Sequence, residues 1–574
     1  MKRRKDRSEL DPARFRMRSR MVVAGLMLMA AALGVRAVHL QVLDQEFLAQ
    51  EGDKRYLREA KVPAHRGAIV DRFGEPLAVS SPVDTVWVNP QVLAQSPEEI
   101  TRLAKALERD PKWLAQRVTS NLDRQFLYVA RHMDPADAER IKALGVPGVE
   151  LMREYKRYYP NGEVTGHVLG FTNLDEAGQE GLELAYDQSL AGIDGLKRVI
   201  KDAQGRLVEN VESIRAPRPG EDLETSIDLR IQYLAYRELK AAVRRHRALA
   251  GSVIVLDVQT GEVLAMVNQP SFNPNDRSQY DVARYRNRAV TDIIEPGSSI
   301  KPFVLAAALG SGRYRADTVV DTSPGYFQVG VKTIQDKHNL GAVDLTTILA
   351  RSSNVGMAKI ALSLEPKQMR DTLTDLGFGQ VTASGFPGES AGLLSPATHW
   401  RPIGIATMAY GYGLSVTPLQ LAQAYATIGA YGVRRPVTFR RVGSPAPGER
   451  ALSEAVSRDL VSLLERVVSP DGTGIKANVP GYRVAGKTGT AWKATAGGYS
   501  QNRYTAVFAG LVPASRPRLA ALVLIDEPSG AQYYGGDVAA PVFAAVMSGA
   551  LRLMGVAPDD LGRAPSTTVV QATP

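Results

Sequence analysis

The chain has 574 residues, so more than one domain is expected, and its 44% hydrophobic and 23% charged residues are typical of a globular protein. It contains no cysteine, which excludes thiolate catalysis, cysteine zinc sites and disulfides. No two of its seven histidines have the spacing of a helical metal site. We therefore expect neither a bound metal nor a cofactor.

The net charge of +10 is concentrated at the N-terminus, where residues 1–20 contain nine Lys or Arg against three Asp or Glu. The rest of the chain is almost balanced, so no nucleic-acid partner is expected. Residues 21–43 are mostly apolar, interrupted by Arg36, and predict an uncleaved transmembrane anchor with the basic tail in the cytoplasm. A cleaved signal peptide is the alternative, because "AAALG" offers small residues.

The part after the anchor predicts an exported α+β domain over residues 44–221. Residues 60–90 have the pattern of strand, turn and strand, and residues 91–145 have a helical pattern with starts at Ser96-Pro97, Asp110-Pro111 and Asp134-Pro135. We interpret Ser96 to Glu99 as a capping box. No catalytic cluster is evident, and the proline-rich segment "RAPRPGED" at 215–222 predicts the end of this domain.

A second α+β domain is predicted over residues 222–560. "AGSVIVLDVQTGEVLAMV" predicts a β-hairpin, and three consecutive strand-like runs follow near the C-terminus, with a largely helical section between. Strands at both ends of the domain with helices between them predict one antiparallel sheet flanked by helices. Residues 561–574 are predicted to be a disordered tail.

The stretch "EPGSSIKPFVLAAALG" places Ser298 and Lys301 on one face of the first turn of an apolar helix. A serine hydroxyl is a poor nucleophile unless a base lies beside it. A lysine can be that base if burial or a second cation lowers its pKa. Taken alone, a helix-capping serine and a solvated lysine are the simpler interpretation.

Two further motifs change that interpretation. Ser352-Ser353-Asn354 interrupts a helical pattern, and Lys487-Thr488-Gly489-Thr490 follows on a strand that we expect to end at the glycine. There the glycine would let a substrate backbone lie against the strand edge, while the lysine and hydroxyls face an anionic carboxylate. Ser-x-x-Lys, Ser-x-Asn and Lys-Thr-Gly in this order resemble the active-site set of penicillin-binding proteins and serine β-lactamases.

Most of the chain resembles the class B penicillin-binding proteins, and among them the division-specific penicillin-binding protein 3 (FtsI-type) branch. "RGAIVDRFGEPLA", "RYYPNGEVTGHVLGF" and "GLE" are similar to runs of the membrane-proximal pedestal domain of that class, and "YGYGLSVTPLQLA" and "YYGG" to runs of its transpeptidase domain. The resemblance implies an elongated pedestal, a β-lactam-sensitive peptidoglycan D,D-transpeptidase, and a single-pass inner-membrane protein of the division septum with a periplasmic catalytic domain.

The resemblance also implies a role for each motif residue. Ser298 would attack the penultimate D-alanine of a D-Ala-D-Ala stem peptide, Lys301 would take its proton, Ser352 would relay a proton to the leaving amine, and Lys487 would tune the network. The implied substrate-binding residues are Asn354 for a side amide, Thr488 and Thr490 for the terminal carboxylate, Gly489 at the strand edge, and Tyr412, with Tyr533 and Tyr534, in the cleft wall. The N–H groups of Ser298 and Thr490 would form the oxyanion hole.

The implied partners are stem peptides, β-lactams, a glycan polymerase of the SEDS type and small divisome membrane proteins. Two other functions stay open. A D,D-carboxypeptidase would use the same residues with water as the acceptor, and a division scaffold would not require an intact set of motifs. The sequence does not identify the diamine of the stem peptide.

Overall fold

The computed structural model describes residues 12–43, 57–201, 207–276, 278, 281–495 and 497–560. The chain forms two compact units: Met1–Ala64, Pro82–Glu154 and Ile193–Arg218 make up unit 1, and His65–Ser81, Tyr155–Gly192 and Pro219–Pro574 make up unit 2. The last crossing between the units lies inside "RAPRPGED", but two earlier segments of the expected first domain, His65–Ser81 and Tyr155–Gly192, also belong to unit 2. The expected domain limits therefore stay a prediction, and the expected C-terminal tail lies outside the described residues.

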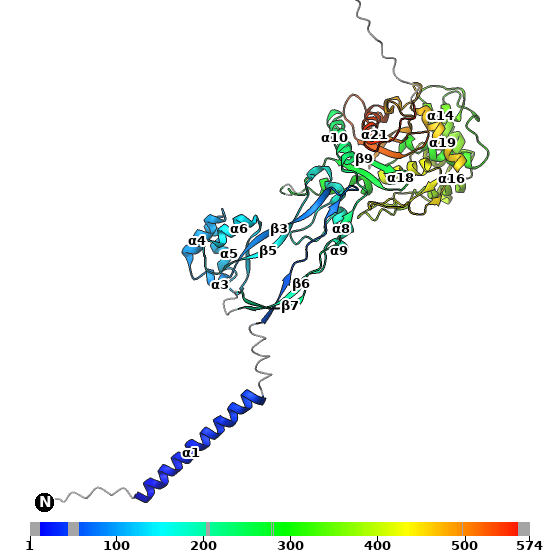
Figure 1. The fold of residues 1–574 in the computed structure, drawn as a ribbon. Helices are drawn as coiled ribbons and strands as arrows, with labels where there is room; N and C mark the ends of the chain where they lie inside the picture. Colours follow the sequence, from blue (N-terminus) through cyan, green and yellow to red (C-terminus); the bar gives the residue numbers. More distant parts are fainter. Residues whose placement is uncertain are drawn as a thin grey trace, which may run out of the picture. The chain divides into compact units, whose positions relative to one another are not determined.

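The N-terminal helix α1 (Pro12–Val38) continues into a π-helical turn, His39–Leu43 (Figure 1). Its segment Phe15–Val42 has a mean hydropathy of 2.1, none of its apolar window is buried, and it is long enough to cross a bilayer. Gly535–Leu553 is also apolar enough, but half of that segment is buried in unit 2. The first of these two segments therefore matches the predicted anchor, and its helix begins before residue 21.

Unit 1 packs short helices against an antiparallel strand pair. Residues 84–88 of β3 (Pro76–Val88) pair with β4 (Leu127–Met133), and side chains of both strands and of the helices share one apolar core. The helices are α3 (Pro90–Leu93), α4 (Pro97–Ala106), α5 (Pro111–Thr119) and α6 (Pro135–Lys142). A separate antiparallel sheet contains β1 (Leu57–Val62), β6 (Gly195–Lys201) and β7 (Leu207–Arg215).

All three predicted helix starts are confirmed, but one cap differs from the prediction. The carboxylates of Asp110 and Asp134 accept N–H groups of the first turns of α5 and α6. Ser96 precedes α4 without a side-chain cap bond, at a ψ of 78° rather than the extended value of the other two caps. The capping box at Ser96 is therefore wrong, although Pro97 does begin the helix.

Unit 2 is built on a five-stranded antiparallel sheet in the order β10-β9-β19-β18-β17. Its strands are β9 (Ala250–Asp257), β10 (Val263–Gln269), β17 (Ala485–Thr495), β18 (Gly498–Val512) and β19 (Leu519–Asp526). The predicted antiparallel sheet, including the hairpin of β9 and β10, is confirmed. β17 is an edge strand, and the Lys-Thr-Gly motif lies on it.

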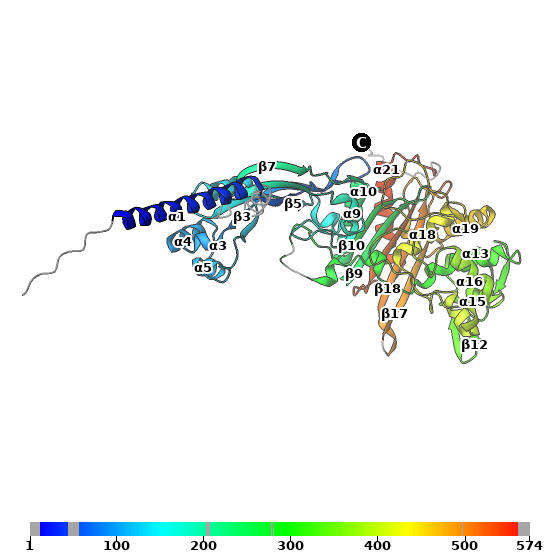
Figure 2. The same cartoon turned by 90° about the horizontal axis from the view of Figure 1, so that it is seen from below.

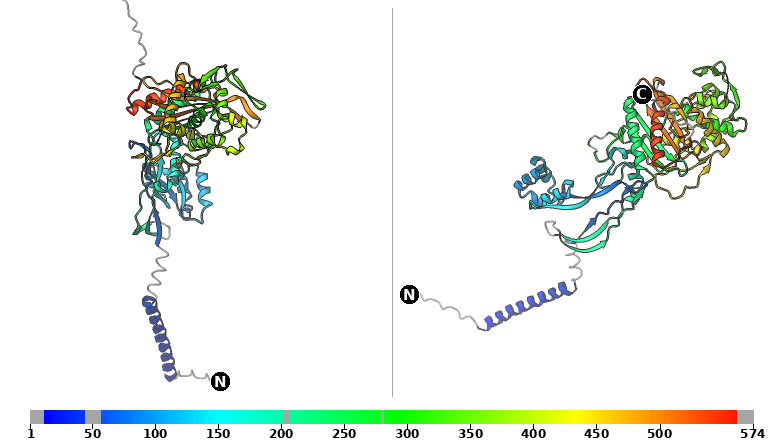
Figure 3. Two further views of the ribbon diagram at one scale, coloured as in Figure 1. Left: turned by 90° about the vertical axis from the view of Figure 1, so that its right-hand side faces the viewer. Right: turned by 45° about the horizontal axis from the view of Figure 1, so that its top comes forward.

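Alternation along the strands gives this sheet two buried faces. Ile254 and Leu256 point to a cluster that includes α13 (Lys301–Gly310) and α18 (Pro418–Gly429), while Val253 and Val255 point to one that includes α10 (Leu229–Arg245) and α21 (Ala540–Leu553). Helices cover both faces of the sheet (Figure 2), and α10 and α21 lie side by side (Figure 3). All twelve residues of α18 are buried, so it is the central helix of the unit.

The remaining elements of unit 2 surround this sheet. The helices are α7 (Gly166–Leu169), α8 (Gly181–Ala185), α9 (Asp187–Leu190), α11 (Val282–Tyr285), α12 (Arg288–Thr291), α14 (Leu345–Arg351), α15 (Asn354–Leu362), α16 (Pro366–Asp375), α17 (Pro402–Met408), α19 (Glu454–Val467) and α20 (Gly535–Val538). The short strands are β2 (Ile69–Val70), β8 (Leu223–Glu224), β11 (Val319–Asp321), β12 (Tyr326–Val329), β13 (Lys332–Gln335), β14 (Ala342–Asp344), β15 (Val433–Arg434) and β16 (Glu449–Arg450), and β5 (Val149–Tyr158) runs through both units. The 3₁₀ turns are η2 (Gly162–Val164), η3 (Gly297–Ile300), η4 (Ala397–His399) and η5 (Ile475–Ala477).

Candidate active site

Ser298 lies in the 3₁₀ turn η3, directly before α13. This tight opening turn lets Pro302 follow Lys301 without breaking the helix. Gly297 has φ +53°, and a Cβ there would lie 3.2 Å from the carbonyl oxygen of Thr490. The turn that carries the serine therefore packs against the free edge of β17.

Buried hydrogen bonds hold this turn in place. The hydroxyl of Ser299 donates to the carbonyl of Pro296 at 2.6 Å, and the hydroxyl of Tyr425 in α18 donates to the carbonyl of Ser299 at 2.9 Å. Tyr425 and Ser299 are completely buried. The central helix thus fixes the backbone on which Ser298 stands.

The Ser-x-Asn motif forms a sharp break between two helices, as predicted. α14 ends at Arg351, Ser352 takes a left-handed conformation with φ +61°, and α15 begins at Asn354. The carboxylate of Asp336 accepts the backbone N–H groups of Asn354 and Val355. Since the first N–H groups of a helix lack internal partners, Asp336 fixes the motif in position.

The Lys-Thr-Gly motif lies inside β17, not at its end, because the strand stays paired with β18 as far as Thr495, with a shift of register between Trp492 and Ala494. The structure gives Gly489 another reason to be a glycine. A Cβ there would lie 2.8 Å from the carbonyl oxygen of Pro296, so the close approach of η3 to β17 requires the missing side chain.

Two lysines lie buried at the centre of the three motifs. Lys301 Nζ lies 2.6 Å from the carbonyl oxygen of Ser352, 2.8 Å from Asn354 Oδ1 and 3.1 Å from Ser352 Oγ. Lys487 Nζ lies 3.1 Å from the same Ser352 Oγ and 3.1 Å from the carbonyl oxygen of Thr488. Both lysines are fully buried, and none of these partners carries a charge.

Burial therefore dominates the electrostatics of the pair. It lowers the pKa of Lys301 well below its ordinary value, the charge of Lys487 lowers that pKa further, and Asp336 opposes the change. Burial also lowers the pKa of Lys487 to about 7. Since Ser352 Oγ lies within reach of both amines, a proton can pass between them through one hydroxyl.

Ser298 stands beside this network without being part of it in the free protein. It is partly exposed, and its hydroxyl forms no hydrogen bond with any described residue. The hydrogen bonds of the Lys301 amine to described residues are all with residues 352–354. A serine, an amine with a lowered pKa and a bridging hydroxyl on three adjoining elements are the components of serine acyl transfer.

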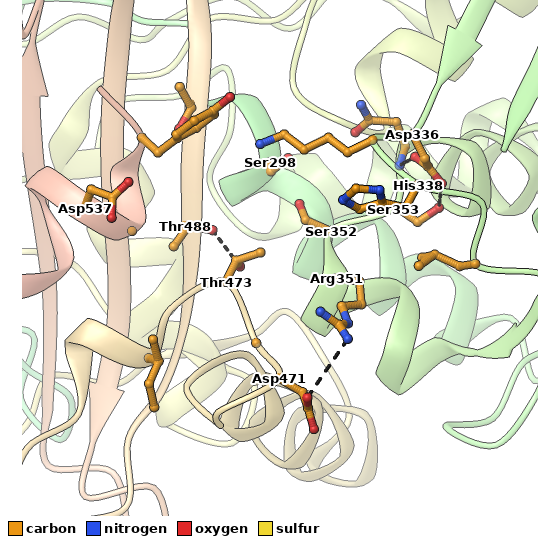
Figure 4. Close-up of a pocket in the computed structure, with 18 of the residues that line it drawn as sticks. Ser298, Asp336, His338, Arg351, Ser352, Ser353, Asp471, Thr473, Thr488 and Asp537 are labelled. Atoms are coloured by element: carbon orange, nitrogen blue, oxygen red, sulfur yellow. Dashed lines mark hydrogen bonds and ion pairs between the residues drawn. The ribbon is translucent and has the colours of Figure 1, made fainter. Parts of the chain in front are cut away.

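The three motifs meet at a cleft with a volume of about 710 Å³ (Figure 4). Its lining includes Ser298, Ser352, Asn354, Thr488 and Thr490. Lys301 and Lys487 lie behind this surface, and Gly489 faces η3. Of the three predicted wall tyrosines, Tyr534 lines the cleft, whereas Tyr533 stacks on Tyr504 at 4.2 Å.

Tyr412 lies outside the cleft lining, at the edge of β17 beyond the motif. Its hydroxyl accepts the backbone N–H of Trp492 at 3.2 Å, and its ring contacts that of Tyr499 at 5.1 Å. Burial raises the pKa of the Tyr412 hydroxyl. These contacts make Tyr412 a packing residue of the strand edge in the free protein.

Two of the polar residues that sequence reasoning missed hold the motifs in place. The hydroxyl of Thr473 lies 2.9 Å from that of Thr488, and its backbone N–H donates to the carbonyl of Ala350 at the end of α14. The other is Asp336, the cap of α15. Neither stands in a recognised motif, and only "DGTG", which marks a turn before Thr473 and Gly474, gave a local signal.

Comparison with known proteins agrees with this geometry. Residues 251–548 match the family described as penicillin binding protein transpeptidase domain, and residues 61–225 match the penicillin-binding protein dimerisation domain. The chain belongs to the class B penicillin-binding proteins of the FtsI type.

Relatives of known name cover almost the whole chain. The chain is 44% identical to the peptidoglycan D,D-transpeptidase FtsI of Escherichia coli K12, over 94% of this chain and 92% of that protein. It is 41% identical to the probable peptidoglycan D,D-transpeptidase PenA of Neisseria meningitidis serogroup B, over 94% and 93%.

Solved structures support the same assignment. The apo transpeptidase domain of Burkholderia pseudomallei penicillin-binding protein 3 has a TM-score of 0.54 and 43% identity, and the match covers 58% of this chain and 97% of that one. A peptidoglycan synthetase of Bifidobacterium adolescentis has a TM-score of 0.69 and 25% identity, covering 88% and 97%.

Proposed function

We propose that this protein is a peptidoglycan D,D-transpeptidase that crosslinks stem peptides through a serine acyl-enzyme and is acylated by β-lactams. The names of the Escherichia coli and Neisseria relatives support this activity. The observation that carries the proposal is the pair of buried lysines, with lowered pKa values, around one serine hydroxyl beside Ser298.

In the proposed acylation, Ser298 Oγ attacks the carbonyl carbon of the penultimate D-alanine. Lys301 starts as the free amine, because its pKa is lowered, and takes the proton of the serine. The C–O bond to Ser298 forms and the bond to the terminal D-alanine breaks. Ser352, within reach of Lys301 and Lys487, passes a proton to the leaving amine.

The substrate would lie along the free edge of β17. Thr488 and Thr490 hold the terminal carboxylate with their hydroxyls, Asn354 binds a side amide, and the N–H groups of Ser298 and Thr490 receive the oxyanion. Gly489 keeps the edge close to η3, and Tyr412 supports the strand beyond it. The amine of a second stem peptide then displaces Ser298 and forms the crosslink.

The proposal extends to the domains, the location and the partners of the protein. We assign residues 1–20 to a cytoplasmic tail, 21–43 to a single anchor in the inner membrane, 44–221 to a pedestal, 222–560 to the periplasmic transpeptidase domain and 561–574 to a tail. We further propose that the protein acts at the division septum with a glycan polymerase of the SEDS type and small divisome membrane proteins. The apolar helix α1 and the FtsI relative support this assignment.

Labelling of the full-length protein in detergent with a fluorescent penicillin tests the acyl-enzyme. We expect a stable band in the wild type, none in Ser298→Ala and slower labelling in Ser352→Ala. Ser311→Ala, at the other end of α13, is the matched control and should label like the wild type. A wild type that penicillin does not label would contradict the proposal. If stem peptides incubated with the protein lose their terminal D-alanine but form no crosslinks, a carboxypeptidase would be favoured.

A further inference from the structure

The cleft contains a lysine that belongs to none of the three motifs. Lys337 lies between β13 and β14 and lines the cleft together with Ser298 and Tyr534. Its ammonium lies 3.9 Å from the centre of the Tyr534 ring. Because an aromatic face attracts a cation, the ring holds this charge at a defined place in the cleft.

Two other cations of the cleft already have carboxylate partners. Lys476 Nζ lies 2.8 Å from Asp537, and Arg351 lies 4.0 Å from Asp471. Lys337 forms no ion pair with any residue in the described part of the chain. Among the lysines and arginines that line the cleft in the described part of the chain, Lys337 is therefore the one that an incoming anion meets without displacing a carboxylate of the protein.

The acidic residue next to Lys337 in the chain does not compensate it. The carboxylate of Asp336 accepts the hydroxyl of Ser353 and the backbone N–H groups at the start of α15. It is thus turned toward that helix terminus, where partial positive charge stabilises it. The next residue, His338, also lines the cleft and adds no negative charge.

An anion at Lys337 would be distinct from the terminal carboxylate of the donor peptide, which the proposed function places at Thr488 and Thr490 on β17. The acyl acceptor supplies a second anion in one class of stem peptide. At the D-centre of meso-diaminopimelate, the attacking amine and a carboxylate share one carbon, whereas the side-chain amine of lysine has no such neighbour. A cation held against Tyr534 in the cleft that Ser298 also lines can therefore orient the first class of amine only.

We propose that Lys337 binds the carboxylate on the carbon that carries the attacking amine of the acyl acceptor. The inference rests on the proposed function and requires an acceptor whose attacking amine and carboxylate share one carbon, as at the D-centre of diaminopimelate or in a free D-amino acid. The amine nitrogen bonds to the acyl carbon, the ester bond to Ser298 breaks, and the proton of the amine passes to Ser298 Oγ. Lys337 positions the acceptor and takes no proton in this step.

Competition between two acceptors tests the proposal. The full-length protein is acylated by a thioester analogue of the donor peptide, and D-alanine is compared with D-alaninamide at equal concentrations of free amine. The two differ only in the carboxylate. We expect the wild type to prefer D-alanine by about tenfold, equivalent to about 1.4 kcal/mol, and Lys337→Gln to lose this preference. Lys337→Arg should retain most of it.

Matched measurements separate this inference from the proposed function. Lys332→Gln removes an exposed lysine of β13 outside the cleft lining and should keep the preference of the wild type. Failure of penicillin to label the wild type would overturn the proposed function. A labelled wild type that does not distinguish the acceptors, or a Lys337→Gln variant that still does, would overturn only the inference. If Lys337→Gln does not fold, the wild type and Lys337→Arg decide the outcome.

Discussion

Unit 2 contains two pairs of buried basic side chains, and the two pairs differ in whether carboxylates neutralise them. Arg66 and Arg157 lie with almost no exposure on either side of Glu183, which is itself fully buried. Arg66 Nη1 also lies 2.7 Å from Asp187. Lys301 and Lys487 are buried just as deeply, but their partners are neutral oxygens and each other.

The pKa values follow from this difference. Burial alone lowers the pKa of Arg66, but the charges of Glu183 and Asp187 and the hydrogen bonds to them outweigh burial and raise it. No carboxylate bonds to either lysine amine, so burial prevails and the pKa falls for both. A buried cation with carboxylate partners keeps its charge and stabilises the fold. A buried lysine without such a partner loses its proton more readily, and its neutral amine can act as a base.

Removing the shared carboxylate should have the largest effect on stability. Glu183→Gln leaves Arg66 and Arg157 buried without their common anion, and breaking a buried pair costs about 3–5 kcal/mol. We expect a correspondingly lower free energy of unfolding of unit 2 in urea titrations. Glu454→Gln, which breaks an exposed pair with Arg458 on α19, is the control and should cause no measurable change. If both variants were equally stable, the buried carboxylate of Glu183 would not stabilise the fold as we infer.

Replacing a reactive lysine should instead slow acylation and leave the stability unchanged. Lys301→Met removes the base and should slow acylation by penicillin about 10²- to 10⁴-fold. Its stability should not fall, because an apolar side chain of similar length replaces an amine that burial disfavours. Stopped-flow acylation and urea unfolding of the same sample measure both effects. A variant with both normal acylation and lower stability would make Lys301 a structural residue.

A smaller change should tune the lysine without removing it. Asp336 is the one carboxylate whose charge raises the pKa of Lys301. Asp336→Asn can still cap α15 but loses that charge, so the pKa of Lys301 should fall further. Acylation requires the free amine, and its rate rises with pH through this pKa. We expect the acid limb of the profile to move to lower pH, and a shift to higher pH would contradict the electrostatic assignment.

The sequence was sufficient for features that depend on short-range patterns. Two β-rich runs on either side of a Thr-Gly pair predicted the hairpin of β9 and β10, and the apolar run after Ser298 predicted the helix α13. The three motifs were grouped because their order matched that of a known family. Their meeting at one cleft needed the long-range pairing of β17 with η3, which no local pattern contains.

Other features depend on contacts between distant segments. From the sequence, the glycine at position 489 was explained by a substrate lying against the strand. The structure shows that the carbonyl of Pro296 also excludes a side chain there. Asp336 gave no signal, since a cap from outside the helix can come from any loop. Tyr412 was predicted in the cleft wall on the basis of resemblance alone, and its bond to Trp492 appears only in three dimensions.

The interleaving of the two units affects how the chain folds during its synthesis. The hydroxyl of Thr225 in unit 2 donates to the carbonyl of Val70, 155 residues earlier in the chain, and β2 pairs in parallel with β8. The ribosome makes residues 65–81 long before their partners. Within that segment β2 can pair with β3 at once, but its pairing with β8 has to wait until residues 223–224 have been made. Closing so long a loop is slow, so the side of β2 that β8 covers stays open in newly made chains, where proteases and chaperones can reach it.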